Sequence, residues 1–219
     1  MKSGRRRRRR RRASWFVRQL DDHLTAHGRR LYGWDEILEG GLAPGATVAS
    51  WRGDTGAIAA ARAGHDVVLC PDTRLYLNYR QSERPDEPIP LVTVITPRDV
   101  YEFDPVPEAL DADGRARVLG AQANLWSEYI DSPRVLDYFA FPRLGALGEA
   151  LWSSGPRSWE EFEPRLDRHL ERLDALGVER RRADGPLPWQ TRPGIPGKPE
   201  TPAERAATVA ALTANIADR

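Results

Sequence analysis

The chain has 219 residues, a formal net charge of +1 and a single cysteine, Cys70. That length suffices for one domain with a sizeable core, and a lone cysteine excludes an internal disulfide. No stretch approaches the roughly 18 apolar residues of a membrane helix, and no apolar signal core follows the basic N-terminus. As written, the chain is therefore expected to be soluble and cytoplasmic, with no membrane partner.

The net charge hides a strong asymmetry. Arg5 to Arg12 supply eight positive charges. Subtracting them from the net charge of +1 gives the rest of the chain a net charge of −7. A block of like charges repels itself, stays extended and attracts phosphates, so a nucleic-acid or membrane-surface arm is one interpretation. No aromatic residues interleave the arginines to stack on bases. We therefore predict a disordered Arg-rich leader over residues 1–13 and do not expect nucleic acid as a partner.

The rest of the chain alternates helices and strands with short connections, which predicts an α/β fold with a parallel sheet. Between the third and fourth strands, residues 71–107 form a long irregular stretch rich in proline and charge. Such loops usually carry function or disorder, and we interpret this one as bearing part of a site. Beyond Arg180, proline and glycine dominate. In chain order, hydrophobic periodicity and stop residues predict a helix over 14–27, a strand over 29–33, a helical turn over 35–38, a strand over 46–51, a helix over 55–63, strands over 66–70 and 118–125, helices over 135–152 and 159–176, and a short helix over 203–216.

Four parallel strands cannot close a barrel. The pattern therefore favours part of a (β/α)8 barrel over residues 14–182, followed by a Pro/Gly-rich tail over 183–219. A complete barrel of this type typically needs roughly 250 residues, which is more than the chain contains. A small open doubly wound sheet is the alternative, but the glycine-rich phosphate fingerprint that such folds often carry is absent from the sequence.

Aromatic and polar side chains recur where the predicted strands end. In a (β/α)8 barrel these ends open onto one face, so distant residues converge around one pocket. Flat aromatic rings cover the weakly polar face of a sugar, and a carboxylate accepts hydrogen bonds from hydroxyls. One tryptophan alone indicates core packing, but this recurrence favours a carbohydrate site, whereas Trp15, Trp152 and Trp159 lie on helices and are predicted to pack there. The candidate site residues are Trp34, Trp51, Tyr76, Asn78, Trp126 and Glu128.

Four segments resemble, in order and spacing, the second half of the catalytic barrel of family 20 glycoside hydrolases, the β-N-acetylhexosaminidases. The likeness extends over roughly Ser14 to Arg180, implies about strands 5 to 8 of the barrel, and includes a linking phrase over residues 101–107. Full-length members of this family can be secreted, so the compartment stays open. The segments are Gly33-Trp34-Asp35-Glu36-Ile37-Leu38-Glu39-Gly40-Gly41, Ser50-Trp51-Arg52-Gly53, Gly120-Ala121-Gln122-Ala123-Asn124-Leu125-Trp126-Ser127-Glu128 and Phe141-Pro142-Arg143-Leu144.

The resemblance implies hydrolysis of terminal, non-reducing β-linked N-acetylhexosamine, with the acetamido oxygen of the substrate as nucleophile. A glutamate protonates the leaving oxygen, and the aspartate before it stabilises the acetamido group. In the family this pair ends a His-x-Gly-Gly-Asp-Glu motif, which occurs nowhere in the sequence. The chain is therefore expected to be a C-terminal fragment that is inactive alone. Expected partners are N-acetylhexosaminide glycans and either a complementary N-terminal half or a second copy, with no cofactor or metal.

The same resemblance assigns roles to the candidate residues. The three strand-end tryptophans correspond to walls around the acetamido methyl group, Tyr76 to the hydroxyl that bonds the acetamido oxygen, and Glu128 to the carboxylate that holds ring hydroxyls. Asn78 departs from the pattern, because the family usually has an aspartate there. An amide keeps an acceptor oxygen but loses the charge, so its hydrogen bond is expected to be weaker by about 1 kcal/mol.

Residue types alone suggest the adjacent Asp35 and Glu36 as an acid pair. By resemblance they belong instead to the separate Trp-Asp-Glu motif after the fifth barrel strand, where structural roles in the loop or at a helix N-terminus are expected. Two further hypotheses stay open. One is a non-catalytic sugar-binding remnant, and the other is an Arg-armed nucleic-acid binder.

Overall fold

The structure is a computed structural model that describes residues 2–89 and 91–217. The chain divides into two compact units, and each is built from segments that are distant in the sequence. The first unit comprises Met1–Asp72, Pro105–Gln122 and Thr208–Arg219, and the second comprises Thr73–Asp104 and Ala123–Ala207.

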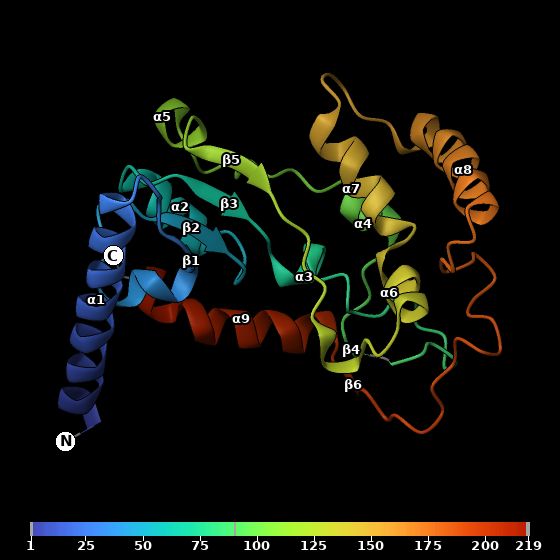
Figure 1. Cartoon of the computed structure of the whole chain (residues 1–219), viewed down its shortest axis with the longest axis horizontal. Helices are drawn as coiled ribbons and strands as arrows, with labels where there is room; N and C mark the ends of the chain where they lie inside the picture. The colour runs from blue at the N-terminus through green and yellow to red at the C-terminus, as the bar shows by residue number, and fades with distance from the viewer. Residues whose placement is uncertain (1, 90, 218–219) are drawn as a thin grey trace. The chain divides into compact units, whose positions relative to one another are not determined.

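A four-stranded parallel sheet forms the centre of the first unit, as the alternating pattern predicts (Figure 1). Its order is β1-β2-β3-β5, and the strands are short because their Val, Ala and Leu runs are short. The elements of this unit are α1 (Lys2–Ala26), β1 (Tyr32–Trp34), the 3-10 helix η1 (Asp35–Gly40), β2 (Thr47–Ser50), α2 (Thr55–Arg62), β3 (Val67–Leu69), α5 (Ala112–Arg115) and β5 (Val118–Ala121).

The core of the first unit lies where α2 packs on β2 and β3. Val48, Val67 and Leu69 are fully buried, as are Ala57 and Ala60 of α2, which is expected where helices cover a parallel sheet. Cys70 is buried too, as its apolar run predicts. A Cβ added at Gly56 would lie 2.8 Å from the hydroxyl of Ser50, so glycine is required where α2 approaches the strand end.

Helix α1 begins at Lys2, within the segment for which the sequence analysis predicts a disordered leader. Arginine has a helix propensity close to that of alanine, so the run can continue the turns of the predicted helix. The helix ends before Gly28, whose positive φ of 66° is the predicted stop. The packing predicted for Trp15 is wrong, because this side chain is exposed.

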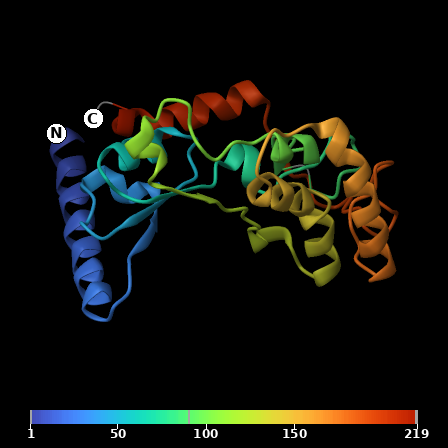
Figure 2. The same cartoon turned by 90° about the horizontal axis from the view of Figure 1, so that it is seen from above.

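The second unit contains most of the long irregular stretch and the helices that follow. The sequence analysis misses the short elements of that stretch, because two-residue strands and single-turn helices leave no periodicity. Figure 2 shows α7 and α8, in gold and orange, lying side by side. The elements of the second unit are α3 (Asp72–Leu75, from the unit boundary), β4 (Leu91–Val92), α4 (Pro97–Tyr101), the 3-10 helix η2 (Ser127–Tyr129), α6 (Pro133–Ala140), α7 (Arg143–Trp152), α8 (Trp159–Ala175) and β6 (Lys198–Pro199).

The long helix predicted over residues 135–152 is two helices, α6 and α7. The break falls at Pro142, which has no amide hydrogen to donate, and Phe141 before it is extended, with φ −110° and ψ 139°. Trp152 ends α7 with 92% of its surface exposed, so its predicted packing is wrong. Trp159 does pack, because its ring lies edge-on to Tyr101.

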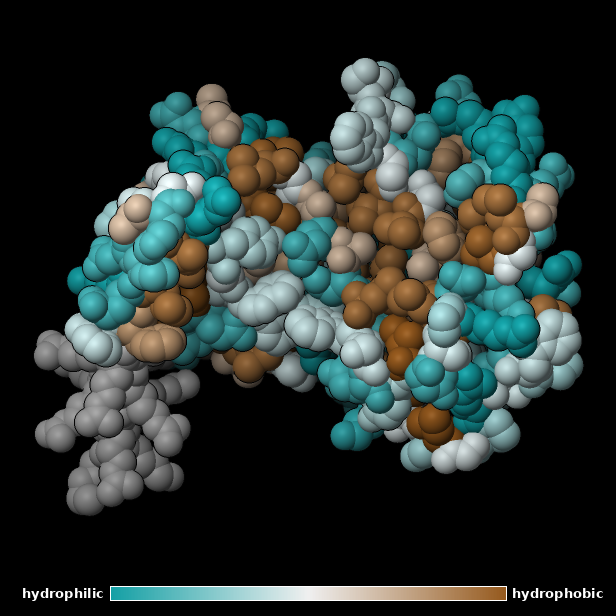
Figure 3. Space-filling model, in the orientation of Figure 1, coloured by the Kyte–Doolittle hydropathy of each residue, from teal (hydrophilic) through white to brown (hydrophobic). Residues whose placement is uncertain are grey.

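The tail ends in helix α9 (Pro202–Ala217), close to the predicted range. Its residues from Thr208 onward belong to the first unit, where Ile216 is buried and the carbonyl of Leu212 accepts a hydrogen bond from Arg52. Large exposed apolar side chains occur in both units, and Figure 3 shows several brown apolar areas on the face it presents. None of the described helices combines the length and the apolar character needed to cross a bilayer.

Candidate functional site

Two candidate tryptophans lie at neighbouring strand ends of the first unit. Trp34 ends β1 opposite Ala49 of β2, and Trp51 follows β2 two residues further along. Both side chains are partly buried. The indole nitrogen of Trp51 donates to both carboxylate oxygens of Glu36 at 3.2 Å, which fixes the ring relative to η1.

A buried ion pair joins the residues that follow these tryptophans, Asp35 after Trp34 and Arg52 after Trp51. Asp35 is 0% exposed, and its carboxylate accepts from the Nε of Arg52 at 2.6 Å and from the backbone amide of Arg52 at 3.2 Å. The guanidinium of Arg52 also donates to Glu39 and to the carbonyl of Leu212, each at 3.2 Å. Burial raises the pKa of Asp35, and the charge of Arg52 opposes that rise. The Asp35 carboxylate therefore links the end of β1 to the end of β2.

The second unit brings Tyr76 and Trp126 together. Tyr76 pairs with Asn124 as an isolated parallel bridge, in which the Leu77 amide donates to the Asn124 carbonyl at 2.8 Å. The rings of Tyr76 and Trp126 then stack with centroids 6.2 Å apart and planes 18° apart. Tyr79 stacks on Tyr76 at 5.6 Å. Tyr76 is buried, whereas 41% of Trp126 is exposed.

Asn78 and Glu128 complete the candidates of the second unit. Asn78 is 8% exposed, and its side-chain oxygen is buried with no hydrogen-bond partner among the described residues. Glu128 lies in η2, two residues beyond Trp126, and is exposed. Trp34 and Trp51 thus belong to one unit, and the other four candidates belong to the second.

Sequence reasoning missed the residue that organises the Tyr76 segment. Arg143, at the start of α7, is fully buried, and its guanidinium donates only to backbone carbonyls of this unit among the described residues. Its place in the Phe141-Pro142-Arg143-Leu144 motif was the available signal, but a motif does not show which carbonyls converge on it. The acceptors are the carbonyls of Leu77 at 2.6 Å, Phe139 at 2.8 Å, Tyr79 at 3.0 Å and Ile95 at 3.1 Å.

A second buried charge cluster of this unit surrounds Glu87. Its carboxylate accepts from the hydroxyls of Ser82 at 2.6 Å and Tyr138 at 3.0 Å, and from the Nε of Arg181 at 2.9 Å. Burial and then the charge of Glu87 raise the pKa of Tyr138 well above its usual value. The adjacent Asp86 and Glu87 are therefore no free acid pair either, because Glu87 is bound in an ion pair with Arg181.

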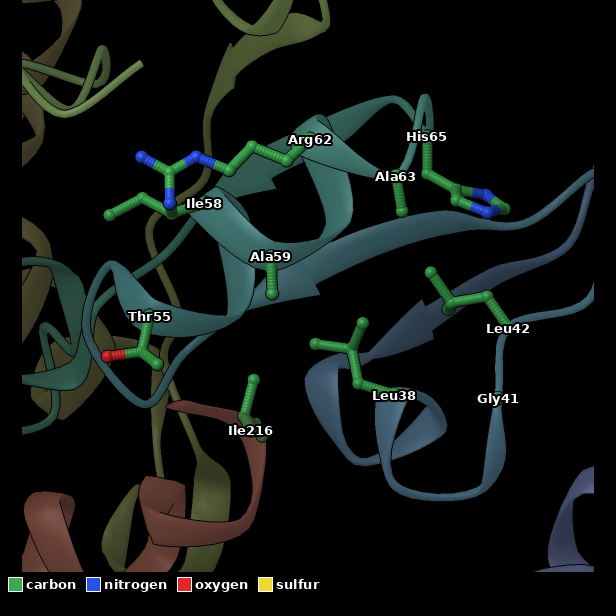
Figure 4. Close-up of a pocket in the computed structure, with 10 residues that line it drawn as sticks. All are labelled: Leu38, Gly41, Leu42, Thr55, Ile58, Ala59, Arg62, Ala63, His65 and Ile216. Carbon is green, nitrogen blue, oxygen red and sulfur yellow. The ribbon is translucent and has the colours of Figure 1, made fainter. Parts of the chain in front are cut away.

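The first unit also contains a cavity of about 560 Å³, shown in Figure 4. Leu38 and Leu42 line one side, Ile58 and Ala59 of α2 another, and Ile216 of α9 reaches in from the tail. None of the candidate sugar residues is among its lining residues. In the part of the chain that the structure describes, no group of three or more His, Cys, Asp or Glu side chains is arranged to hold a metal ion.

Comparison with known proteins identifies the family. The model of the glycosyl hydrolase family 20 catalytic domain matches residues 1–155, a range that also includes the Arg-rich segment. The chain belongs to glycosyl hydrolase family 20. The predicted resemblance is therefore confirmed, and the parallel sheet described above is part of a family 20 catalytic domain.

Relatives in the same family support this assignment. A β-hexosaminidase of Porphyromonas gingivalis is 46% identical over 167 residues, which are 75% of this chain and 22% of the relative. The crystal structure of a family 20 exo-β-N-acetylglucosaminidase from Vibrio harveyi in complex with N-acetylglucosamine matches 78% of this chain and 27% of its own, with 35% identity and a TM-score of 0.71. A mutant Streptomyces plicatus β-hexosaminidase in complex with GlcNAc matches 84% of this chain and 37% of its own, with 28% identity and a TM-score of 0.68.

The chain thus spans well under half the length of each of these family 20 relatives. The family 20 match ends before α8, so α8 and the tail with α9 lie beyond it.

Proposed function

We propose that these 219 residues supply the sugar-binding part of a β-N-acetylhexosaminidase, which hydrolyses terminal, non-reducing β-linked N-acetylhexosamine. The observation that carries this proposal is the stacked pair of Tyr76 and Trp126, which a parallel bridge holds in register. The exposed part of the Trp126 indole offers a flat apolar surface as a wall for the acetamido methyl group of the sugar. The buried Tyr76 behind it provides the hydroxyl for the acetamido oxygen.

The remaining candidates take the roles that the family resemblance implies. In the first unit, Trp34 and Trp51 are walls for an acetamido methyl group, and in the second, the exposed carboxylate of Glu128 accepts from ring hydroxyls. A buried acceptor without a partner costs about 1–3 kcal/mol. The side-chain oxygen of Asn78 is such an acceptor among the described residues, and a sugar hydroxyl would supply its donor.

In the reaction, the acetamido oxygen of the substrate attacks C1 while the bond from C1 to the leaving oxygen breaks. A glutamic acid transfers its proton to that leaving oxygen, and an aspartate stabilises the oxazolinium ion. We propose that this acid pair comes from outside these residues. The two adjacent Asp-Glu pairs of the sequence, at Asp35 and at Asp86, each contain a carboxylate that a buried arginine contact occupies.

A glycosidase assay tests this division of labour. We expect the purified chain to release no nitrophenol from an aryl N-acetyl-β-glucosaminide, because loss of a general acid alone costs on the order of 10²- to 10⁴-fold in rate. Addition of a chain that carries the His-x-Gly-Gly-Asp-Glu motif is expected to restore hydrolysis. Turnover by the chain alone that Glu36→Gln abolishes would contradict the proposal.

Binding of duplex DNA separates this function from the nucleic-acid hypothesis. The Arg run predicts weak binding that falls steeply with salt. Tight binding that persists at high salt, and that deletion of Arg5 to Arg12 removes, would favour a nucleic-acid function instead.

A further inference from the structure

The guanidinium of Arg143 is the most completely buried charge in the second unit. The residue is 0% exposed, and no carboxylate forms an ion pair with it among the described residues. Four carbonyl oxygens replace water around the charge, at 2.6 to 3.1 Å. Burial lowers the pKa of Arg143 to about 9. A charge held in this way is expensive to bury, so its position needs an explanation beyond filling the core.

The four carbonyls come from three separate stretches of chain. One belongs to Phe139 on α6, and one belongs to Ile95 before α4. The other two belong to Leu77 and Tyr79, which flank Asn78 on either side. A planar guanidinium has donors that point in fixed, divergent directions, so a single arginine can connect all three stretches.

Leu77 thus fixes the segment that follows Tyr76 through both of its backbone groups. The amide of Leu77 donates to the carbonyl of Asn124, and the carbonyl of Leu77 accepts from Arg143. Asn124 in turn donates from its own amide to the carbonyl of Leu75. The bridge to Asn124 sets the position of the strand end, and Arg143 prevents the segment from rotating about it.

We propose that Arg143 is the positioning residue that holds Tyr76 and Asn78 in place for the sugar. It touches neither the sugar nor the reacting atoms, and it acts through the backbone of Leu77 and Tyr79. The role in sugar binding rests on the proposed function, whereas the backbone clamp does not.

Arg157 offers a matched comparison within the same unit. Its guanidinium also donates to two carbonyls, those of Tyr101 and Phe103, each at 2.9 Å. Neither acceptor belongs to the segment from Tyr76 to Tyr79. A lysine at position 143 keeps the charge but gathers its donors on one nitrogen, so it cannot reproduce the bonds that Arg143 makes from both of its terminal nitrogens. Arg157 makes both of its bonds from one nitrogen, which a lysine can replace more closely.

Hydrogen exchange followed by NMR on the full chain tests the clamp. In Arg143→Lys, we expect the amides of Leu77 and Asn124 to exchange at least about tenfold faster relative to the amide of Gln190, a change of about 1.4 kcal/mol. Gln190 is buried and its amide donates to Leu187 at 2.8 Å, so it reports on the unit as a whole. Arg157→Lys is expected to leave that ratio unchanged.

A general loss of stability gives a different result. If Arg143→Lys accelerates all amides of the unit by the same factor, the arginine is a core residue only and the proposal is wrong. If the variant does not fold, the unmodified chain still decides. The amides of Leu77 and Asn124 should then exchange only through denaturant-dependent unfolding, and exchange that ignores denaturant would contradict a clamp.

A titration with N-acetylglucosamine separates this inference from the proposed function. If the unmodified chain binds the sugar, Arg143→Lys is expected to weaken binding at least about tenfold, while Arg157→Lys binds normally. Normal binding by Arg143→Lys would overturn the positioning role. If the unmodified chain binds no sugar, the proposed function is wrong. The exchange experiment then still tests the backbone clamp, because it does not depend on sugar binding.

Discussion

Each unit contains a buried arginine that bonds to residues beside the aromatic side chains assigned to the sugar, but the two guanidinium charges are stabilised differently. In the first unit, Arg52 pairs with the carboxylate of Asp35 next to Trp51. In the second, Arg143 is surrounded by backbone carbonyls next to Tyr76. A carboxylate partner joins two side chains and so fixes two strand ends. Carbonyl partners instead fix the path of the backbone itself.

The comparison explains why the adjacent acids of the first unit are poor candidates for catalysis. Asp35 is buried against Arg52, whereas Glu36 is exposed and accepts a hydrogen bond from the indole of Trp51. A general acid must reach the leaving oxygen and exchange its proton. Asp35 cannot do so without breaking the ion pair, and Glu36 stays on the surface beside the ring that it orients.

Removing the carboxylate of Asp35 is expected to have the largest effect on stability. Asp35→Asn leaves the buried Arg52 with only the partly exposed Glu39 as a charged partner, and breaking a buried pair typically costs about 3–5 kcal/mol. Urea denaturation followed by tryptophan fluorescence measures this loss. Asp66→Asn is the matched control in the same unit, because Asp66 pairs with the exposed Arg30 and Arg117 and each such pair contributes about 0–1 kcal/mol. Equal losses in the two variants would contradict the role of burial.

The Glu87 cluster of the second unit predicts a dependence of stability on alkaline pH. Unfolded tyrosine ionises near pH 10, while burial and Glu87 hold the pKa of Tyr138 well above that value. Above pH 10 Tyr138 therefore keeps its proton in the folded chain and loses it in the unfolded chain, which lowers stability as pH rises, while the lowered pKa of Arg143 acts in the opposite direction. Tyr32, whose pKa burial raises to about 12, adds to the same fall.

Tyr138→Phe sharpens that prediction. At pH 8 it should lose about 1.5–3 kcal/mol, because the Glu87 carboxylate loses a hydrogen bond. Between pH 10 and 12 its stability should fall less steeply than that of the unmodified chain, as urea midpoints at each pH would show. Tyr129→Phe removes an exposed hydroxyl and serves as the control. An unchanged slope in Tyr138→Phe would mean that another group carries the alkaline transition.

A smaller effect is expected where the second unit departs from the family pattern. Asn78→Asp restores a charged acceptor for a sugar hydroxyl, so affinity for N-acetylglucosamine should rise by about 1 kcal/mol, roughly fivefold. An NMR titration of the full chain measures it. Asn215→Asp, on α9, makes the same charge change and should leave affinity unaltered. Weaker binding by Asn78→Asp would mean that no sugar hydroxyl donates to the side chain of residue 78.

Glu36→Gln is expected to change least. Glutamine keeps an acceptor for the indole of Trp51, so both stability and sugar affinity should stay within about 0.5 kcal/mol of the unmodified chain. Set beside Asp35→Asn in the same melts, it shows that two neighbouring acids have unequal roles. A loss as large as that of Asp35→Asn would remove the distinction.

Much of the fold follows from local patterns in the sequence. Alternating apolar runs predict the four parallel strands, and Gly28 and the helix from Trp159 lie where stop signals and periodicity place them. The helix break at Pro142 was also predictable, since proline cannot donate and the residue before it avoids helical angles. The apolar residues on both sides of it hid the break.

The contacts behind the site could not be predicted in the same way. Arg52 lies 17 residues from Asp35, and Arg143 lies 66 residues from Leu77, so only the folded chain brings them together. Backbone acceptors leave no mark on the sequence at all. The docking of α9 on Arg52 was equally invisible, because a carbonyl of Leu212 makes the hydrogen bond.

The central claim is that Trp126 and Tyr76 form a pocket for the acetamido group, and one titration tests it most directly. The full chain, labelled with ¹⁵N at tryptophan, is titrated with N-acetylglucosamine and in parallel with glucose, which lacks the acetamido group. The indole resonance of Trp126 is assigned by its loss in Trp126→Phe. We predict a saturable shift of this resonance with N-acetylglucosamine and none with glucose. Equal shifts with both sugars, or no shift with either, would contradict the account.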